Sequence, residues 1–224
     1  MKHKIFIAVD TSKIDKAKEI LKKTQSKKLH FGYKFGLEFI NSKNGRKFLA
    51  ELKKKTIFLD LKLNDIPNTC LSTIKAVKDL RPNYITVHIN SGFNALKSVK
   101  KVSGKIKIVG VTTLTSLDEK SLRELGYNIK LNSLILKQAK LASKAKLDAL
   151  VCSAREVKIV KKIFKKEIIT PGIRFNSNVN DQKRVMTPKK AFENGSDWIV
   201  IGRPITKGNI KKNISKLINH LKND

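Results

Sequence analysis

The chain has 224 residues, of which 40% are hydrophobic, and it contains 11 glycines and 5 prolines. This composition can bury a large core, which excludes disordered and fibrous classes and fits one globular domain over residues 1–224. The formal charge of +31 would suit a nucleic-acid or anionic-membrane partner, yet 42 of the 49 basic residues are lysines spread along the chain and only seven are arginines. Proteins that clamp phosphates or read bases favour clustered arginine, so biased composition explains the charge better than a specific nucleic-acid partner.

Short apolar runs rich in β-branched residues recur along the chain, with amphipathic stretches between them. Such runs predict buried strands, and the alternation predicts parallel βα units. Their even spacing favours the α/β class, as a single closed (β/α)8 TIM barrel, over an open doubly wound sheet. In chain order the expected strands are Ile5–Val9, a weaker Leu29–Phe35, Thr56–Leu61, Tyr84–Ile89, Ile106–Thr112, Ala149–Cys152, Ile168–Thr170 and Trp198–Ile201.

Local signals mark helix ends in the second half of the chain. Ser153 and Glu156 have the spacing of a capping box after the sixth strand, and Thr187-Pro188 is typical of an N-cap followed by proline in the first turn. Gly195 suits the end of that helix. The Asn- and Ser-rich segment Phe175–Gln182 has neither helical nor strand periodicity, so we expect a lid loop there.

The cysteines and the first apolar run bear on location. Cys70 and Cys152 are far apart, lie in apolar surroundings and have no histidine beside them, so we expect reduced packing residues and no metal site. The run Ile5–Val9 is too short for a signal-peptide core or a membrane span. The sequence therefore predicts a soluble, cytoplasmic protein with no membrane partner.

Polar residues gather at the predicted carboxyl ends of the strands. In a barrel of this kind the active site lies at these ends, and phosphate groups are commonly held by the loops after the seventh and eighth strands. So many polar side chains on one rim favour a functional site over a purely structural one. They are Asp10, Lys34, Asp60, Lys62, Asp65, His88, Thr112, Thr115, Ser153, Arg174, Gly202 and Arg203.

The segment Phe58–Thr69 carries the strongest chemical signal. Strand alternation places Asp60 and Lys62 on one face, so an acid and a base project together from the barrel mouth, and Asp65 follows the strand. A salt bridge at a strand end would account for the first two charges alone. The third charge, followed by Ile-Pro-Asn-Thr at the start of a helix, favours a catalytic site instead.

The run Asp60-Leu-Lys-Leu-Asn-Asp-Ile-Pro-Asn-Thr69 resembles the signature of orotidine 5′-monophosphate decarboxylases. Other strand ends resemble the same family, in the right order and over nearly the whole chain. They are Ala8–Asp10, Lys34–Gly36, Val111–Ser116, Val151–Ala154, Pro171–Arg174 and Ile201–Pro204. Ordered agreement at this many places is not expected by chance.

The resemblance implies the reaction and its catalytic residues. The family removes the carboxylate at C6 of the orotate ring of orotidine 5′-monophosphate and protonates the resulting carbanion to give UMP, with no metal or other cofactor. Lys62 matches the proton donor, and Asp60 and Asp65 match its two flanking acids. Lys34 matches the fourth charge of an alternating Lys34–Asp60–Lys62–Asp65 network. Lys34 and Asp60 also match substrate contacts. Nearby carboxylates keep a lysine in its ammonium form, and a fixed network stabilises developing charge without reorganising.

The resemblance also implies how the phosphate is bound. Arg203 and the backbone N–H of Gly202 match the 5′-phosphate site, Arg174 belongs to the same pocket, and Gln182 matches a phosphate contact from the lid. A guanidinium fork and a glycine that allows close approach suit a phosphate.

The remaining implications concern the nucleoside and assembly. Asp10 matches a ribose-binding acid and Thr115 a pyrimidine contact, while Thr69 lies in the shared Asp-Ile-Pro-Asn-Thr run. The resemblance also implies a twofold homodimer, in which Asp65 would complete the partner's active site.

Other residues in these regions are better explained by structure than by chemistry. His88 lacks a second ligand or a nucleophile and is interpreted as a hydrogen-bonded residue of the barrel mouth. Ser153 suits an N-cap and Trp198 suits barrel packing. Phe93 stands where the family favours a small residue, so the sequence does not predict the shape of that loop.

Two other functions compete with this interpretation. Relatives on the same barrel that act on sugar phosphates, as decarboxylases or aldolases, share the Asp-x-Lys-x-x-Asp pattern but use a divalent metal; here the motif continues as Ile66–Thr69 and no further acid is evident for Mg²⁺. A basic nucleic-acid-binding module would be consistent with the charge of +31, but such a module predicts clustered arginine and exposed aromatics, and aromatic residues make up only 6%.

Overall fold

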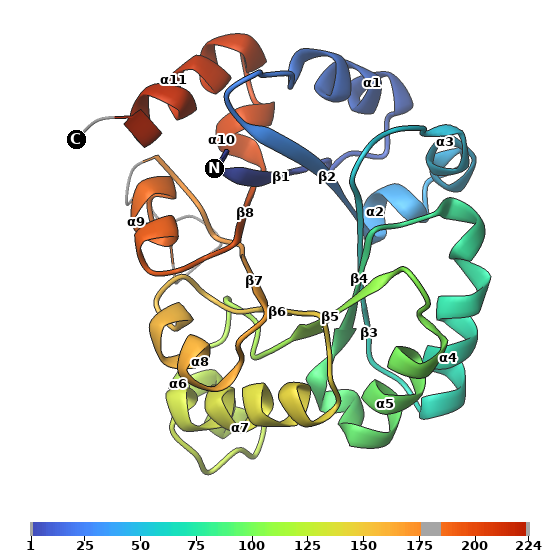
Figure 1. The fold of residues 1–224 in the computed structure, drawn as a ribbon, viewed down its shortest axis with the longest axis vertical. Coiled ribbons are helices and arrows are strands. Elements are labelled where there is room, and N and C mark those ends of the chain that lie inside the picture. Colours follow the sequence, from blue (N-terminus) through green and yellow to red (C-terminus); the bar gives the residue numbers. More distant parts are fainter. Residues whose placement is uncertain (1, 176–184, 223–224) are drawn as a thin grey trace.

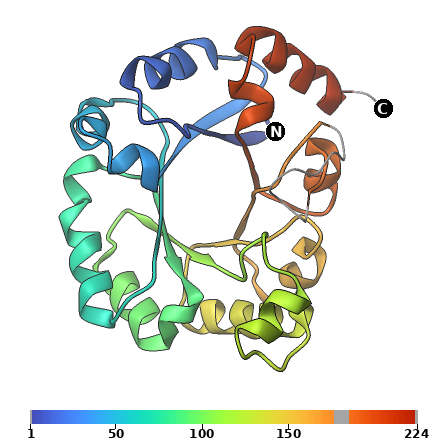
Figure 2. The same cartoon turned by 180° about the vertical axis from the view of Figure 1, so that it is seen from behind.

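The computed structural model describes residues 2–175 and 185–222. In these ranges eight parallel strands pair in chain order and close into a barrel, and helices surround it on the outside (Figure 1). Figure 2 shows the same ring of helices from behind. The predicted closed (β/α)8 barrel is confirmed. The strands are β1 Lys4–Ala8, β2 His30–Gly36, β3 Ile57–Leu63, β4 Tyr84–His88, β5 Lys107–Val111, β6 Ala149–Val151, β7 Glu167–Thr170 and β8 Trp198–Ile201.

The helices cover the barrel because each turns an apolar stripe inward. In α1 the buried residues Ala17, Ile20 and Leu21 lie three and four positions apart, whereas Lys18 and Lys22 are exposed. No helix in the described ranges is both long and apolar enough to cross a membrane. The α-helices are α1 Ile14–Lys23, α2 Leu37–Ile40, α3 Gly45–Glu51, α4 Pro67–Ala76, α5 Gly92–Val102, α6 Glu119–Glu124, α7 Leu131–Lys144, α8 Val157–Ile163, α9 Pro188–Glu193, α10 Arg203–Thr206 and α11 Ile210–Lys222, with the 3₁₀ turns η1 Lys78–Leu80 and η2 Ile89–Ser91.

Large side chains fill the interior of the barrel. Phe6 stacks on Trp198 with ring centroids 4.0 Å apart, and Phe58 and Tyr84 pack around Phe6. These residues belong to one buried cluster inside the strands, so the packing role expected of Trp198 is confirmed. The barrel is thus a packed core, and a ligand can enter only above this layer.

The helix-end signals are largely confirmed. Glu156 accepts the N–H of Ser153 at 2.9 Å, as in a capping box, but the Ser153 hydroxyl accepts from Arg155 and α8 begins only at Val157. Thr187 is the N-cap of α9, with proline in its first turn, and Gly195 follows that helix with a φ of +101°. The predicted strand ends differ from the observed ones by at most two residues, the largest difference being at β3.

Residues 176–184 lie outside the described residues, and they include Gln182 and most of the expected lid loop Phe175–Gln182. The described residues on either side of this gap are held together. Arg174 donates its backbone N–H to Met186 at 3.0 Å, and Met186 donates to Gly172 at 3.2 Å. Both ends of the segment are therefore fixed at the carboxyl end of β7.

Candidate active site

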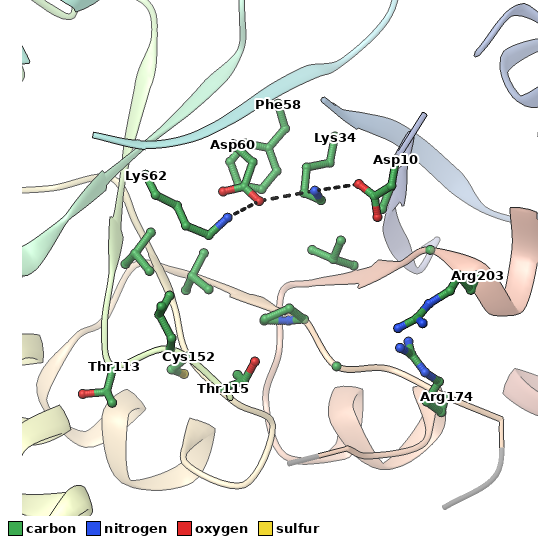
Figure 3. Close-up of a pocket in the computed structure, with 18 residues that line it drawn as sticks. Asp10, Lys34, Phe58, Asp60, Lys62, Thr113, Thr115, Cys152, Arg174 and Arg203 are labelled. Carbon is green, nitrogen blue, oxygen red and sulfur yellow. Dashed lines mark hydrogen bonds and ion pairs between the residues drawn. The ribbon is translucent and has the colours of Figure 1, made fainter. Parts of the chain in front are cut away.

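A pocket of about 260 Å³ opens at the carboxyl ends of the strands. Strand residues such as Phe58, Val111 and Val200 give it an apolar base, and charged side chains reach into it from the strand ends (Figure 3). Of the residues assigned to the site from sequence, those that line the pocket are Asp10, Lys34, Asp60, Lys62, Thr115, Arg174, Gly202 and Arg203.

Four of these side chains form a row of alternating charge. Nζ of Lys62 lies 2.9 Å from Oδ2 of Asp60. Lys34 Nζ lies 3.3 Å from the same oxygen and 3.3 Å from Oδ1 of Asp10, and Figure 3 shows the row running along one wall. The side chains of Asp60 and Lys34 are 12% and 13% exposed, against 40% for Lys62. Of the two lysines that contact Asp60, Lys62 is therefore the one more open to a ligand.

Neighbouring charges in the row determine the charge states of Asp60 and Lys34. Burial acts to raise the pKa of Asp60, but the ammonium groups of Lys34 and Lys62 outweigh it and hold that pKa below its ordinary value. Burial likewise acts to lower the pKa of Lys34, and the Asp60 and Asp10 carboxylates more than offset it, so this pKa is raised. Asp60 is therefore a carboxylate and Lys34 an ammonium at neutral pH.

Lys62 reaches Asp60 through an irregularity in β3. Between the register pairs Leu59–Ile85 and Leu63–Val87, β3 advances four residues and β4 only two. Lys62 lies in this bulge with a φ of +48°, a conformation that costs a non-glycine residue about 1–3 kcal/mol. Bulges next to active sites commonly re-aim a side chain. The two side chains meet as the sequence predicts, but not through regular strand alternation.

Two arginines lie at the opposite end of the pocket from Lys62. The guanidinium groups of Arg174 and Arg203 approach each other there (Figure 3). A Cβ on Gly202 would come within 3.3 Å of the Ala8 Cβ and 3.5 Å of Asp10 Oδ2, so glycine lets the end of β8 pack closely on the end of β1. Two adjacent guanidinium groups are suited to a phosphate dianion.

A buried amide supports the loop that carries Thr115. Oε1 of Gln138, on α7, accepts the backbone N–H of Thr113 at 2.9 Å and its hydroxyl at 3.1 Å. Nε2 of Gln138 donates to Asn90 at 3.1 Å. The loop after β5 is therefore tied to the loop after β4 and to the helix behind both.

Asp65 and Thr69 do not line the pocket of their own chain. Oδ1 of Asp65 accepts the N–H of Ile66 at 2.7 Å. Ile66, the next residue, is 65% exposed. A second hollow, of about 250 Å³, is lined by Asp10, Lys34, Asp60 and Lys62 together with the exposed Leu37, so the charged row can be reached from a second side.

His88 and Phe93 have structural contacts. Nδ1 of His88 accepts the N–H of Asn90 at 3.3 Å. Burial first, and the nearby charge of Lys62 second, lower the pKa of His88, which favours the neutral acceptor form. Phe93 is half-buried in the first turn of α5, and Lys144 Nζ lies 4.8 Å from its ring centroid.

Thr86, Gln138 and Cys152 are among the residues near the site that were not assigned to it from sequence. Thr86 and Gln138 are a strand threonine and a helix glutamine, and no local pattern marks either as important. Cys152 is a buried free thiol, as expected of a packing residue, but it also lines the pocket. Among residues 2–175 and 185–222, no three His, Cys, Asp or Glu side chains are grouped so that they could hold a metal ion.

Known proteins resemble the chain over most of its length. The protein of Wolbachia pipientis subsp. Culex pipiens named orotidine 5′-phosphate decarboxylase is 44% identical over 191 residues, covering 83% of this chain and 84% of that protein. The protein of the same name from Carboxydothermus hydrogenoformans is 40% identical over 218 residues, covering 92% and 90%.

A solved structure and a family profile indicate the same family as these relatives. The crystal structure of orotidine 5′-phosphate decarboxylase from Lactobacillus acidophilus has a TM-score of 0.84 at 30% sequence identity, covering 99% of this chain and 100% of that one. The profile of the orotidine 5′-phosphate decarboxylase / HUMPS family matches residues 3–216. The chain belongs to the orotidine 5′-phosphate decarboxylase / HUMPS family.

Proposed function

We propose that this protein decarboxylates orotidine 5′-monophosphate to uridine 5′-monophosphate, the last step of de novo pyrimidine nucleotide synthesis, without a metal or other cofactor. The observation that carries the proposal is the charge layout of the pocket. A lysine ammonium beside a buried carboxylate lies at one end, and paired guanidinium groups lie at the other. A single barrel domain over residues 1–224 and a cytoplasmic location are part of the same proposal.

Lys62 is the general acid in this scheme. The bond from C6 to the carboxylate breaks, CO₂ leaves, and the electron pair stays on C6. The Lys62 ammonium donates a proton to C6, and the resulting amine is reprotonated from solvent. Asp60 and Lys34 are already held in their charged forms, so the row stabilises the developing negative charge without rearranging.

The other pocket residues bind the parts of the substrate that do not react. Arg203, the N–H of Gly202 and Arg174 hold the 5′-phosphate, with Gln182 as a further contact. The two adjacent guanidinium groups at one end of the pocket support this assignment, because together they suit a phosphate dianion. Binding energy from the phosphate can then be used to order the site around the ring.

Assignments for the ribose and the ring follow the same layout. Asp10 binds the ribose, since it lies between Lys34 and the Gly202 backbone. Thr115 contacts the pyrimidine from the loop that Gln138 supports.

The active form is a homodimer in which Asp65 and Thr69 contribute to the partner's site. Three observations support this. Neither residue lines the pocket of its own chain, Ile66 beside Asp65 is strongly exposed, and the second hollow, lined partly by α2, also reaches Lys62. An acid entering this hollow from a partner would lie near Lys62.

One experiment tests the reaction and its cofactor requirement together. Purified protein is incubated with orotidine 5′-monophosphate in excess EDTA, and loss of the orotate absorbance is followed, with Lys62→Ala as the control. Undiminished turnover in chelator supports the proposal. Activity that returns only with added Mg²⁺ would contradict the cofactor-free reaction, and no loss of orotate absorbance under either condition would favour a sugar-phosphate enzyme of the same family.

A further inference from the structure

Thr86 lies beneath the charged row without lining the pocket. It is fully buried in the middle of β4. Its neighbours Ile85 and Val87 pack in the cluster outside the strands, so Thr86 points into the barrel. Tyr84, two positions earlier, lies in the interior cluster.

The hydroxyl of Thr86 links the backbone of one catalytic residue to the side chain of another. Oγ1 accepts the N–H of Lys62 at 2.7 Å and lies 3.2 Å from Oδ1 of Asp60. A carboxylate can only accept, so the single hydroxyl proton points to Asp60 and a lone pair remains for Lys62. The direction of both hydrogen bonds is therefore fixed.

The bulge in β3 explains why this link is needed. Thr86 is the β4 residue between the register pairs Leu59–Ile85 and Leu63–Val87, opposite the extra residues of β3. There the Lys62 N–H donates to the Thr86 side chain, while Lys62 keeps a φ of +48°. The Thr86 hydroxyl therefore supplies the acceptor that the Lys62 N–H needs at the point where the register of β3 and β4 shifts.

The same hydroxyl also orients the carboxylate. Oδ2 of Asp60 faces the ammonium groups of Lys62 and Lys34, while Oδ1 is held by Thr86. With one oxygen fixed from below, the other is presented to the two lysines. Both ends of the Lys62–Asp60 pair thus depend on one side chain.

We propose that Thr86 is a positioning residue for the decarboxylation, holding Lys62 in its left-handed conformation and Asp60 in its orientation so that the ammonium is aimed at the reacting carbon. This inference rests on the proposed function and adds to it a residue that does not touch the substrate. The conformation of the proton donor Lys62 then depends on a side chain of β4 as well as on β3.

The test compares substitutions that keep or remove the hydroxyl. Thr86→Val is nearly isosteric and removes both hydrogen bonds, whereas Thr86→Ser keeps them. Because small misplacements of reacting groups are costly, Thr86→Val should lower kcat by about 10–100-fold. KM and the dissociation constant of UMP should change by less than about threefold, and Thr86→Ser should keep kcat within about threefold of native.

Thr170→Val is the matched control. Thr170 is also fully buried in a strand, and its hydroxyl bonds to the Ser196 hydroxyl at 2.6 Å, not to the charged row. This variant should lose stability much as Thr86→Val does and yet keep kcat. Equal kcat in Thr86→Val and Thr86→Ser, or equal losses in Thr86→Val and Thr170→Val, would overturn the proposal. If Thr86→Val does not fold, Thr86→Ala removes the same hydroxyl and is judged by the same outcomes.

A crystal structure of Thr86→Val tests the geometry independently of turnover. Lys62 should leave its φ of +48°, or its Nζ should move away from the 2.9 Å contact with Asp60. An unchanged bulge would overturn the inference even in an active enzyme. No turnover by the native protein would instead contradict the proposed function, and the crystal structure would then decide whether Thr86 holds the bulge.

Discussion

Lys62 and Asp60 are joined twice, once by the 2.9 Å contact between Nζ and Oδ2 and once through the Thr86 hydroxyl, which binds the Lys62 N–H and Asp60 Oδ1. The first link is an ion pair open to the pocket, and the second is a buried hydrogen-bonded path beneath it. A pair held at both backbone and side chain has little freedom to reorganise as charge develops in the pocket, which is the condition for electrostatic stabilisation of a carbanion.

Replacing Lys62 by alanine should abolish turnover while leaving the fold intact. The ammonium is the proposed proton donor, and general acid catalysis commonly contributes about 10²–10⁴-fold to a rate, so kcat should fall by at least that much. Stopped-flow or absorbance assays give the rate, and circular dichroism checks the fold. Lys158→Ala, at an exposed position of α8, controls for loss of a lysine and should retain native activity. A correctly folded Lys62→Ala enzyme with more than a small fraction of native turnover would exclude Lys62 as donor.

Glycine at position 62 should give a more stable protein than alanine at the same position. In an ordinary strand glycine is the poorer choice, but the φ of +48° at Lys62 favours it. The free energy of unfolding of Lys62→Gly should exceed that of Lys62→Ala by about 1 kcal/mol, measured with denaturant. Neither variant has the amine, so the comparison isolates the backbone. A more stable Lys62→Ala would mean that the bulge relaxes once the lysine is gone.

The barrel could be predicted from sequence because its strands are buried on both faces and therefore read as short apolar runs. Trp198–Ile201 is the plainest case, since the predicted and observed bounds coincide. The bulge of β3 could not be predicted, because residues 60–63 contain no glycine or proline to mark it. The pairing of Asp60 with Lys62 was expected from strand alternation and arises from a different local geometry.

The contacts that support the site were beyond prediction for a different reason. Thr86 is an ordinary strand residue by propensity, and its importance depends on a register shift in the neighbouring strand. Gln138 lies 25 positions from Thr113 in a helix that is otherwise read by its apolar stripe. Arg174 and Arg203 could be placed together in advance, because they follow the neighbouring strands β7 and β8, where barrels commonly hold a phosphate.

The contribution of Asp60 to stability should depend on pH. Its folded-state pKa lies below the ordinary value of 3.8, so the unfolded chain binds the proton more readily. The stabilisation is therefore present above about pH 4 and is lost as pH falls through the folded pKa. Asp60→Asn should lower the free energy of unfolding at pH 7, and the gap to the native protein should narrow below pH 4. Asp79→Asn, which removes an exposed ion pair with Arg46, should change stability by less than about 1 kcal/mol. A gap for Asp60→Asn that does not vary between pH 7 and pH 3 would contradict this assignment.

Removing Arg203 should reduce kcat/KM through the phosphate alone. Loss of a charge-assisted, bidentate contact should cost several kcal/mol of transition-state binding, with each 1.4 kcal/mol worth about tenfold. The native enzyme should show a comparable loss when given orotidine without its phosphate, and Arg203→Ala should discriminate little between nucleotide and nucleoside. Arg46→Ala, on the surface of α3, controls for the loss of an arginine. Equal use of the nucleotide by the Arg203→Ala and native proteins would show that the phosphate binds elsewhere.

Asp65 should act in the neighbouring subunit, and mixing two inactive variants tests this. If Asp65 completes the partner's site, Lys62→Ala disables the site in its own barrel and Asp65→Ala disables the site next door. Each variant alone should be nearly inactive. A mixed dimer places both lesions in one site and leaves the other native, because the two sites of a twofold dimer exchange the same residues. Random pairing makes half of the dimers mixed, so co-refolding equal amounts should recover roughly a quarter of native activity.

The mixing experiment needs proof that subunits exchange, which differently tagged copies provide by co-purification. Mixing Lys62→Ala with Arg203→Ala is the matched control. It tests whether placing two substitutions on different chains is enough to restore activity. Both of those residues line the pocket of their own barrel, so their mixed dimer should have two damaged sites and recover no activity. Recovery with Asp65→Ala and none with Arg203→Ala would place the acid in the partner's site. No recovery in either mixture, despite demonstrated exchange, would place Asp65 in its own chain's site, reached by movement of the segment between β3 and α4.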